Sequence, residues 1–259
     1  MAGSDRAVGV LKLFTLEQPV WTVEQAAGAL GVSASSAYRY FAALTDAGLL
    51  TTAASGCYTL GPAIIQYDRQ IQLTDPLLQA AKPVMADITR FAPAGSTVLL
   101  CRLFRETVLC VHQVADADRP TRVSYERGRP MPLFRGATSK IILAHLAPRE
   151  LRRVYEANPG EASALGATWE AFRGAMTEMR RAGHAVTRAE LDPGSLGIAA
   201  AILDDNRRVL GSLSYVVPLA AEAGAVRLAA LAMAGAAEVG QAMRAGRQAC
   251  GAGGPLRLA

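Results

Sequence analysis

The fold of the N-terminal part of the chain is decided by residues 22–62, TVEQAAGALGVSASSAYRYFAALTDAGLLTTAASGCYTLGP. Thr22 precedes an apolar-periodic run, and Gln25 follows it three positions later, which is the pattern of a capping box at a helix start. Gly31 ends this helix where a left-handed residue is favoured, and Ser33 can cap a second helix directly after it. Short alternating strands at 49–52 and 57–60 follow. The order helix, helix, hairpin predicts a winged helix-turn-helix.

The second helix is expected to show a polar outer face. Ala37, Phe41 and Leu44 recur at helical spacing and form its inner face. The outward positions carry small hydroxyls, one guanidinium and one phenol, which can contact bases and phosphates in the major groove. They are Ser35, Ser36, Arg39 and Tyr40. The complete set of expected DNA contacts is Thr22, Ser33, Ser35, Ser36, Tyr38, Arg39, Tyr40 and Ser55. The two helices alone leave open a plain packing unit with a solvated outer face.

The charge distribution predicts weak DNA binding by a single copy. Residues 1–62 hold three basic and four acidic residues, net −1, whereas the rest of the chain holds 24 basic and 18 acidic residues, net +6. The wing turn carries no cation. Counterion release grows with the number of phosphates that are neutralised. We therefore expect a shallow salt dependence and a reliance on two or more copies.

A linker helix is expected over residues 63–74. Pro62 can occupy the first turn of a helix, and Asp75-Pro76 breaks the pattern. One face collects Ile64, Tyr67, Asp68 and Ile71. Such a face serves either dimer formation or packing within its own domain, and the residues leave both open.

Residues 75–247 predict a second, α+β domain. Helical patterns cover 77–91, 139–145, 169–182 and 224–247, and β-rich runs cover 97–103, 107–113, 122–125, 198–204 and 208–217, with a further strand starting at His184. This mixed order predicts an antiparallel sheet with helices set against it. Residues 248–259 are expected to form a flexible tail.

A candidate anion site lies at the predicted helix start after residue 135. Gly136, Ala137, Thr138 and Ser139 combine small side chains with the free N–H groups of a helix start, which favours a carboxylate. Five arginines precede or adjoin it: Arg119, Arg122, Arg127, Arg129 and Arg135. Three alternatives stay open. The helix start can be capped by Thr138 or Ser139 with nothing bound, Arg129 and Arg135 can pair with Glu126 or Asp192, and residues 192–194 can be a simple turn.

No catalytic residue, metal site or cofactor is expected. The chain lacks a GxSxG elbow, a Walker loop, an HExxH motif and a GxGxxG run after a strand. Cys110 and His112 are two candidate metal ligands without a third, and apolar strands should raise the pKa of Cys101 and Cys110. No apolar run approaches a membrane span and residues 1–14 lack a secretory pattern, so we expect no membrane partner, a cytoplasmic protein and reduced thiols.

Five segments together resemble the IclR-type bacterial transcriptional regulators: DRAVGVLKLF (5–14), GVSASSAYRYFAALTDAGLL (31–50), YTLGP (58–62), GRPMPLFRGATSKIILAHL (128–146) and MRRAGHAVTRAELDPGSLGIAAAILDDNRRVLGSLS (179–214). The resemblance implies a winged helix-turn-helix in 1–62, a linker helix in 63–74 that helps form dimers, and a GAF-like effector domain in 75–247. It also implies binding to double-stranded operator DNA as a homodimer or homotetramer. The effector would be a small organic acid.

The resemblance extends the expected effector site by Val123, Thr187, Gly197 and Ser214. The complete set is Val123, Tyr125, Arg129, Ala137, Thr138, Ser139, Thr187, Asp192, Gly197 and Ser214. Relatives usually have a His and small residues in place of Leu133-Phe134-Arg135, and often a Pro in place of Ala201. Phe134 and Tyr125 can therefore narrow the pocket, and the effector's identity does not carry over.

The function expected from the sequence is a ligand-responsive transcriptional regulator, either repressor or activator. Two other classes stay open at this point. A small-molecule or redox sensor that acts through protein contacts would show no operator preference, and an enzyme of unfamiliar type would turn over the molecule that it binds.

Overall fold

The computed structural model describes residues 3–54, 56–116 and 123–251, and it divides at residue 75 into two compact units. The first unit contains α1 (Gly3–Leu11), β1 (Trp21–Thr22), α2 (Val23–Leu30), α3 (Ala34–Asp46), β2 (Leu50–Ala54), β3 (Cys57–Leu60) and α4 (Ala63–Thr74). The second contains α5 (Pro76–Thr89), β4 (Thr97–Phe104), β5 (Thr107–Ala115), β6 (Pro130–Pro132), α6 (Ala137–Ala144), α7 (Pro148–Ala157), α8 (Pro159–Ala162), α9 (Trp169–Ala182), β7 (His184–Arg188), β8 (Ser195–Leu203), β9 (Val209–Pro218), the 3-10 helix η1 (Leu219–Gly224) and α10 (Ala225–Gly251).

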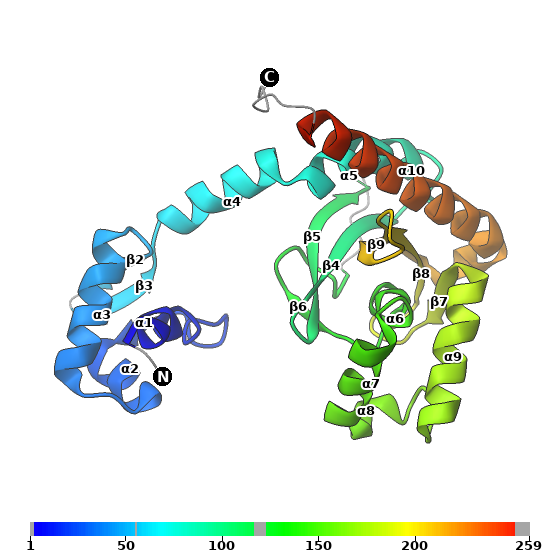
Figure 1. Cartoon of the computed structure of the whole chain (residues 1–259). Helices are drawn as coiled ribbons and strands as arrows, with labels where there is room; N and C mark the ends of the chain where they lie inside the picture. Colours follow the sequence, from blue (N-terminus) through cyan, green and yellow to red (C-terminus); the bar gives the residue numbers. More distant parts are fainter. Residues whose placement is uncertain (1–2, 55, 117–122, 252–259) are drawn as a thin grey trace. The chain divides into compact units, whose positions relative to one another are not determined.

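The first unit is a helix-turn-helix closed by a small antiparallel sheet of order β1-β3-β2 (Figure 1). Its core is built from the periodic positions of α2 and α3, including Val23, Ala26 and Phe41, and from Leu50 on the wing. The Phe41 ring meets the Tyr58 ring edge-on at a centroid distance of 4.9 Å, which joins α3 to β3. The predicted winged helix-turn-helix is confirmed.

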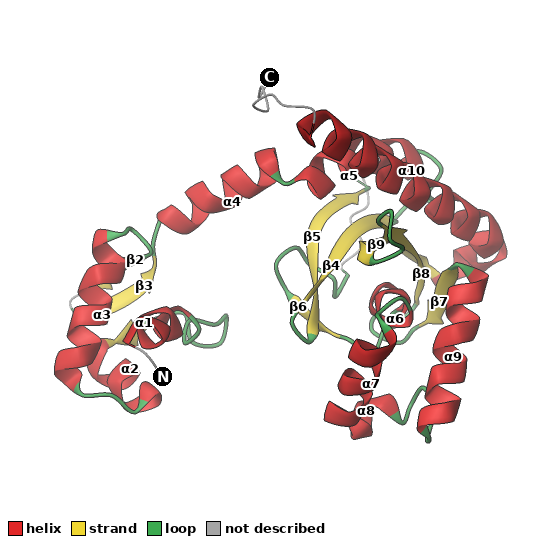
Figure 2. Ribbon diagram, viewed as in Figure 1, coloured by secondary structure: helices red, strands yellow, loops and turns green. Residues whose placement is uncertain are grey.

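The second unit is a three-layer structure around an antiparallel sheet of order β6-β5-β4-β9-β8-β7 (Figure 2). Because side chains alternate along a strand, β4 sends Val98 and Leu100 into a core with α5 and α10, whereas Leu99 and Cys101 enter a second core under α6, α7 and α9. The α+β fold with an antiparallel sheet between helices is as predicted.

The structure corrects the expected strand at 122–125. Arg122, like Arg119, lies outside the described residues, and Val123, Ser124 and Tyr125 form no strand. The reason is a tertiary contact, since the Ser124 N–H donates to the carboxylate of Asp192 at 3.0 Å and not to a neighbouring strand. The edge of the sheet is formed by β6, which pairs with β5.

Three helical features also differ from expectation. The helices α7 and α8 were not expected, and Pro148 at the start of α7 is a favourable first-turn residue. The final helix runs through Gly251, past the expected boundary at residue 247, and residues 252–259 of the expected tail lie outside the described residues.

The expectation that no apolar stretch approaches membrane-spanning length is wrong for the C-terminal helix. Residues 219–246 are long and apolar enough to cross a membrane by length and composition. This helix nevertheless packs on the sheet, where Leu228, Ala232 and Val239 are buried in the core with α5. One face of this helix is therefore part of the core of the second unit.

Candidate functional site

Side-chain caps fix the starts of both α2 and α3, and a left-handed glycine ends α2. The Thr22 N–H donates to Gln25 Oε1 at 3.0 Å, and the Gln25 N–H donates to Thr22 Oγ1 at 3.2 Å, so the predicted capping box is present. Gly31 adopts a left-handed conformation with φ 63°. Ser33 accepts from the Ser36 N–H at 3.3 Å. The hydroxyls of Thr22 and Ser33, both expected to contact DNA, are thus engaged within the protein.

The outer face of α3 is mostly as predicted. Ser35 and Arg39 are exposed, Ser36 is half-buried, and Tyr38 is 53% exposed. Tyr40 differs, because it lies half-buried against the core of the first unit. Its position between the inner-face residues Ala37 and Leu44 places it at the flank of the helix.

We call the winged helix-turn-helix of residues 1–62 the reading unit. Tyr38 connects its helices α2 and α3. Its hydroxyl donates to Glu24 Oε1 at 2.7 Å. This hydrogen bond lowers the pKa of Glu24 and raises the pKa of Tyr38 from their usual values. A carboxylate therefore lies on the exposed surface beside the α3 face, and it is one of the acidic residues that give residues 1–62 a net charge of −1.

The wing is a tight hairpin. Strands β2 and β3 pair with a register shift between Thr52 and Ala54, and Gly56 adopts a left-handed conformation with φ 72°. Ser55, an expected DNA contact in this turn, lies outside the described residues. The base of the wing needs Gly61, because a Cβ there would lie 2.2 Å from the Gly48 carbonyl oxygen.

The helix α4 presents apolar side chains to solvent within its unit. Ile65 is 74% exposed, and Tyr67, Ile71 and Leu73 are about half exposed. Apolar side chains that gather into one exposed patch mark sites of association, and Tyr67 and Ile71 share one face of this helix with Ile64.

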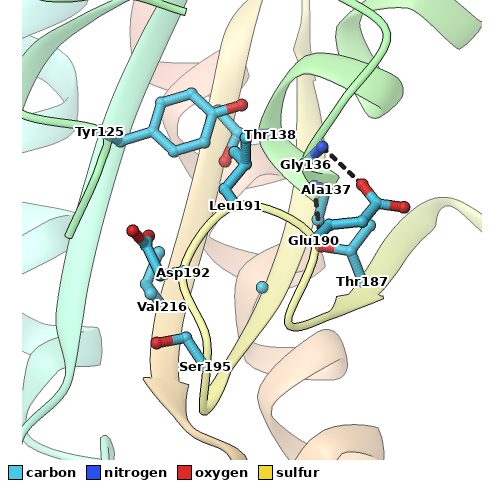
Figure 3. Close-up of a pocket in the computed structure, with 11 residues that line it drawn as sticks. Tyr125, Gly136, Ala137, Thr138, Thr187, Glu190, Leu191, Asp192, Ser195 and Val216 are labelled. Atoms are coloured by element: carbon cyan, nitrogen blue, oxygen red, sulfur yellow. Dashed lines mark hydrogen bonds between the residues drawn. The ribbon is translucent and has the colours of Figure 1, made fainter.

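A small cavity lies at the start of α6, between the sheet and the segment that joins β7 to β8 (Figure 3). Its volume is about 30 Å³. Six of the expected effector residues line it, namely Tyr125, Ala137, Thr138, Thr187, Asp192 and Gly197. Gly136, which the sequence placed at the anion site, also lines it, together with four residues that sequence reasoning did not assign: Glu190, Leu191, Ser195 and Val216.

The other four expected effector residues lie away from the cavity lining. Val123 is buried in the core under α6, and Arg129 is exposed. Ser139 and Ser214 are buried, and each bonds a residue that lines the cavity. The site is therefore smaller and more closed than the sequence indicated.

Two N–H groups at the start of α6 are satisfied by side chains of β7 and of the segment that follows it. The Gly136 N–H donates to Glu190 Oε2 at 2.7 Å, and the Ala137 N–H donates to Thr187 Oγ1 at 3.1 Å. The alternative of a cap by Thr138 or Ser139 is wrong, because α6 has no side-chain cap of its own. The Thr138 hydroxyl donates to Ser214 Oγ at 2.9 Å, and Ser139 Oγ lies 2.8 Å from the Tyr125 hydroxyl.

The charges around the cavity are internally compensated. Lys140, on the second turn of α6, forms an ion pair with Glu190, and Arg135 donates to the Glu190 carbonyl oxygen. Asp192 accepts from the N–H and the hydroxyl of Ser124, so it is not the partner of Arg135. Burial raises the pKa of Tyr125, which keeps its phenol protonated.

The cysteine pair on the sheet has no sign of reactive chemistry. Cys101 and Cys110 face each other on β4 and β5, and both are buried. Burial raises the pKa of Cys101, as predicted, and a hydrogen bond with Cys110 adds to the effect. Within residues 3–54, 56–116 and 123–251 no three metal-ligating side chains come together.

Comparison with known proteins places both units in one family. Residues 4–54 match the IclR helix-turn-helix domain, and residues 72–238 match the bacterial transcriptional regulator IclR C-terminal domain. The HTH-type transcriptional regulator KipR of Bacillus subtilis (strain 168) is 26% identical over 212 residues, which cover 81% of this chain and 83% of that protein.

Solved structures show the same fold. An IclR transcriptional regulator from Alicyclobacillus acidocaldarius has a TM-score of 0.76 at 22% identity, with 93% of this chain and 98% of that chain covered. An IclR homolog from Microbacterium hydrocarbonoxydans, complexed with 4-hydroxybenzoate, has a TM-score of 0.75 at 20% identity, with 94% and 100% covered. The C-terminal family match alone spans more than half of the sequence, and the chain belongs to the IclR family of bacterial transcriptional regulators.

Proposed function

We propose that this regulator binds operator DNA as a symmetric homodimer, or as a tetramer built from such dimers, and reads the major groove with the outer face of α3. The observation that carries this proposal is the exposed face of Ser35, Tyr38 and Arg39 on α3, a helix whose start is capped by Ser33. Arg39 is the base-reading residue, because a guanidinium forms bidentate hydrogen bonds with guanine. Ser35 contacts a phosphate.

Two copies are needed because one reading unit has no net positive charge and therefore binds the DNA phosphates weakly. Residues 1–62 have a net charge of −1, and the Tyr38–Glu24 hydrogen bond holds a carboxylate against a residue of the α3 outer face. The exposed apolar side chains of α4 supply the dimer contact. A two-fold dimer places two α3 helices on half-sites about 34 Å apart, so the operator is a palindrome or near-palindrome.

The signal is a small organic acid that binds at the start of α6 in the cytoplasm. Support comes from the residues there, where the Gly136 N–H already binds a carboxylate, that of Glu190, and Lys140 places a buried cation beside it. The 4-hydroxybenzoate bound by the Microbacterium homolog is an acid of this class. An acid that prefers one arrangement of the two reading units shifts the population toward it and thereby changes DNA affinity.

The test is fluorescence anisotropy with the purified full chain on the intergenic region upstream of its own gene. A scrambled duplex of equal length is the control, and both are measured from 50 to 200 mM salt. Specific binding that survives 200 mM salt and is altered by members of a carboxylic acid panel is expected. Equal, salt-sensitive binding to both duplexes would contradict operator recognition.

A further inference from the structure

We propose that the Glu190 carboxylate is an internal stand-in for the effector, occupying the place that the effector's own carboxylate takes, and that the effector must displace it. This inference rests on the proposed effector pocket. Glu190 Oε2 accepts from the Gly136 N–H at 2.7 Å, and Oε1 pairs with Lys140. Figure 3 shows the Glu190 side chain pointing at the start of α6 beside Thr187. A carboxylate already holds the position that α6 prepares for one.

The cavity has no room for an organic acid while Glu190 stays in place. Its volume of about 30 Å³ corresponds to roughly one water molecule. Leu191 and Tyr125 close it on the side of Gly136, because a Cβ added to Gly136 would lie 2.6 Å from Leu191 Cδ1 and 2.8 Å from the Tyr125 hydroxyl. Entry of any ligand larger than water therefore requires the segment that carries Glu190 and Leu191 to move.

This segment, residues 189–194, forms a strap that backbone hydrogen bonds tie at both ends: the Ala189 N–H donates to the Ser195 carbonyl oxygen at 2.8 Å, and the Leu219 N–H donates to the Gly194 carbonyl oxygen at 2.7 Å. Arg135 donates to the Glu190 carbonyl, and Ser124 donates to Asp192 at 3.0 Å. Ala189, at the start of the strap, has φ 49°, a left-handed conformation that is unfavourable for a residue with a Cβ. This strained residue lies directly beside Glu190, in the part of the strap that has to move.

The charges select the ligand class. The Lys140 side chain is only 11% exposed and depends on Glu190 for its counter-charge, whereas Glu190 is 33% exposed and can be hydrated once displaced. A neutral ligand would leave a buried ammonium group unpaired, which is strongly unfavourable. A monocarboxylate replaces one negative charge by another. The effector is therefore a small monocarboxylic acid, and its uncharged amide or ester is inactive.

The experiment uses acetate, which contains the atoms that Glu190→Ala removes. The melting temperature of the full chain is measured against acetate concentration at constant ionic strength set with sodium chloride, and acetamide serves as the neutral isostere. We expect acetate to bind Glu190→Ala at least tenfold more tightly than the wild type, with no effect of acetamide. The double variant Glu190→Ala/Lys140→Met should lose this response.

Glu222→Ala is the matched control, because it removes a carboxylate that pairs with Arg188 at the base of the same strap without touching α6. Equal acetate stabilisation of Glu190→Ala and Glu222→Ala would overturn the proposal, and so would stabilisation by acetamide. If Glu190→Ala does not fold, Glu190→Gln keeps the side-chain volume and should still bind acetate more tightly than the wild type.

The two proposals fail separately. The acetate experiment contains no DNA. It can therefore detect the acetate site in a protein that does not bind the operator, and it can fail in a protein that does bind the operator. For an acid found in the operator screen, Glu190→Ala should lower its Kd at least tenfold. An unchanged or raised Kd would show that Glu190 only supports the fold of the pocket.

Discussion

Arg39 is the only basic residue in the sequence of α3, and it lies exposed on the outer face of that helix. Arg39→Ala should reduce discrimination between the operator and a scrambled duplex by about 1–3 kcal/mol, the usual value of one bidentate contact. Lys12→Ala is the control, because it removes one exposed positive charge from the same unit away from α3. Anisotropy titrations on both duplexes measure the ratio of the Kd for the scrambled duplex to the Kd for the operator. Equal losses in the two variants would mean that Arg39 acts only through its charge.

The hydrogen bond between Tyr38 and Glu24 gives a second prediction at the scale of one residue. Tyr38→Phe removes the donor that holds the pKa of Glu24 below its usual value. The pKa of Glu24 should therefore rise in the variant, as measured by NMR titration of its side-chain carboxyl carbon. Because the folded-state pKa is the lower one, the bond stabilises the wild type above the usual pKa of Glu. That stabilisation is lost as the pH falls through the lowered pKa. An unchanged titration of Glu24 would show that the bond does not persist in solution.

At the scale of elements, the close packing at the base of the wing can be tested by comparing two glycine-to-alanine substitutions. Gly61 has no room for a Cβ, whereas Gly28 in α2 has open space around it. Gly61→Ala places a Cβ against the backbone of Gly48 and Leu50, so it should destabilise the first unit by about 1–3 kcal/mol. Gly28→Ala lies in the exposed part of α2 with nothing within 4 Å, and it should stabilise the unit by about 0.5–1 kcal/mol. Urea unfolding followed by circular dichroism gives the free energy of unfolding of each variant for comparison with the wild type. Equal effects would show that the wing base is not packed as closely as the structure indicates.

The elements that the sequence predicted well are those whose signals are local. The helix 169–182 was predicted with the bounds found for α9, since its apolar periodicity ends at Gly183, which is left-handed with φ 76°. The capping box of α2 is likewise contained in four consecutive residues. The strand expected at 122–125 was wrong because Ser124 bonds Asp192, 68 positions later. Glu190 and Leu191 were missed for the same reason, because only the folded sheet brings the β7–β8 segment to α6.

At the scale of the whole molecule, the proposed mechanism joins two weak interactions into one response. One copy of residues 1–62 has a net charge of −1, and in the proposed mechanism the small cavity takes its acid only after Glu190 is displaced. Pairing two reading units raises the effective concentration of the second once the first is bound. A modest change in their relative placement is then enough to alter operator affinity strongly.

The apolar surface of α4 tests this dependence on pairing. The double variant Ile65→Glu/Ile71→Glu places two charges on side chains that are 74% and 53% exposed within the unit, so it should break the dimer without disturbing the core. Gln66→Glu/Gln70→Glu adds the same charge to exposed polar positions of α4 and is the control. Light scattering after gel filtration should give the variant a mass near the 27.2 kDa of one chain. The slope of log K against log salt is about −0.9 per phosphate contact, so losing one reading unit should halve it. If the isoleucine variant stays dimeric and keeps the full slope, the copies associate through another surface.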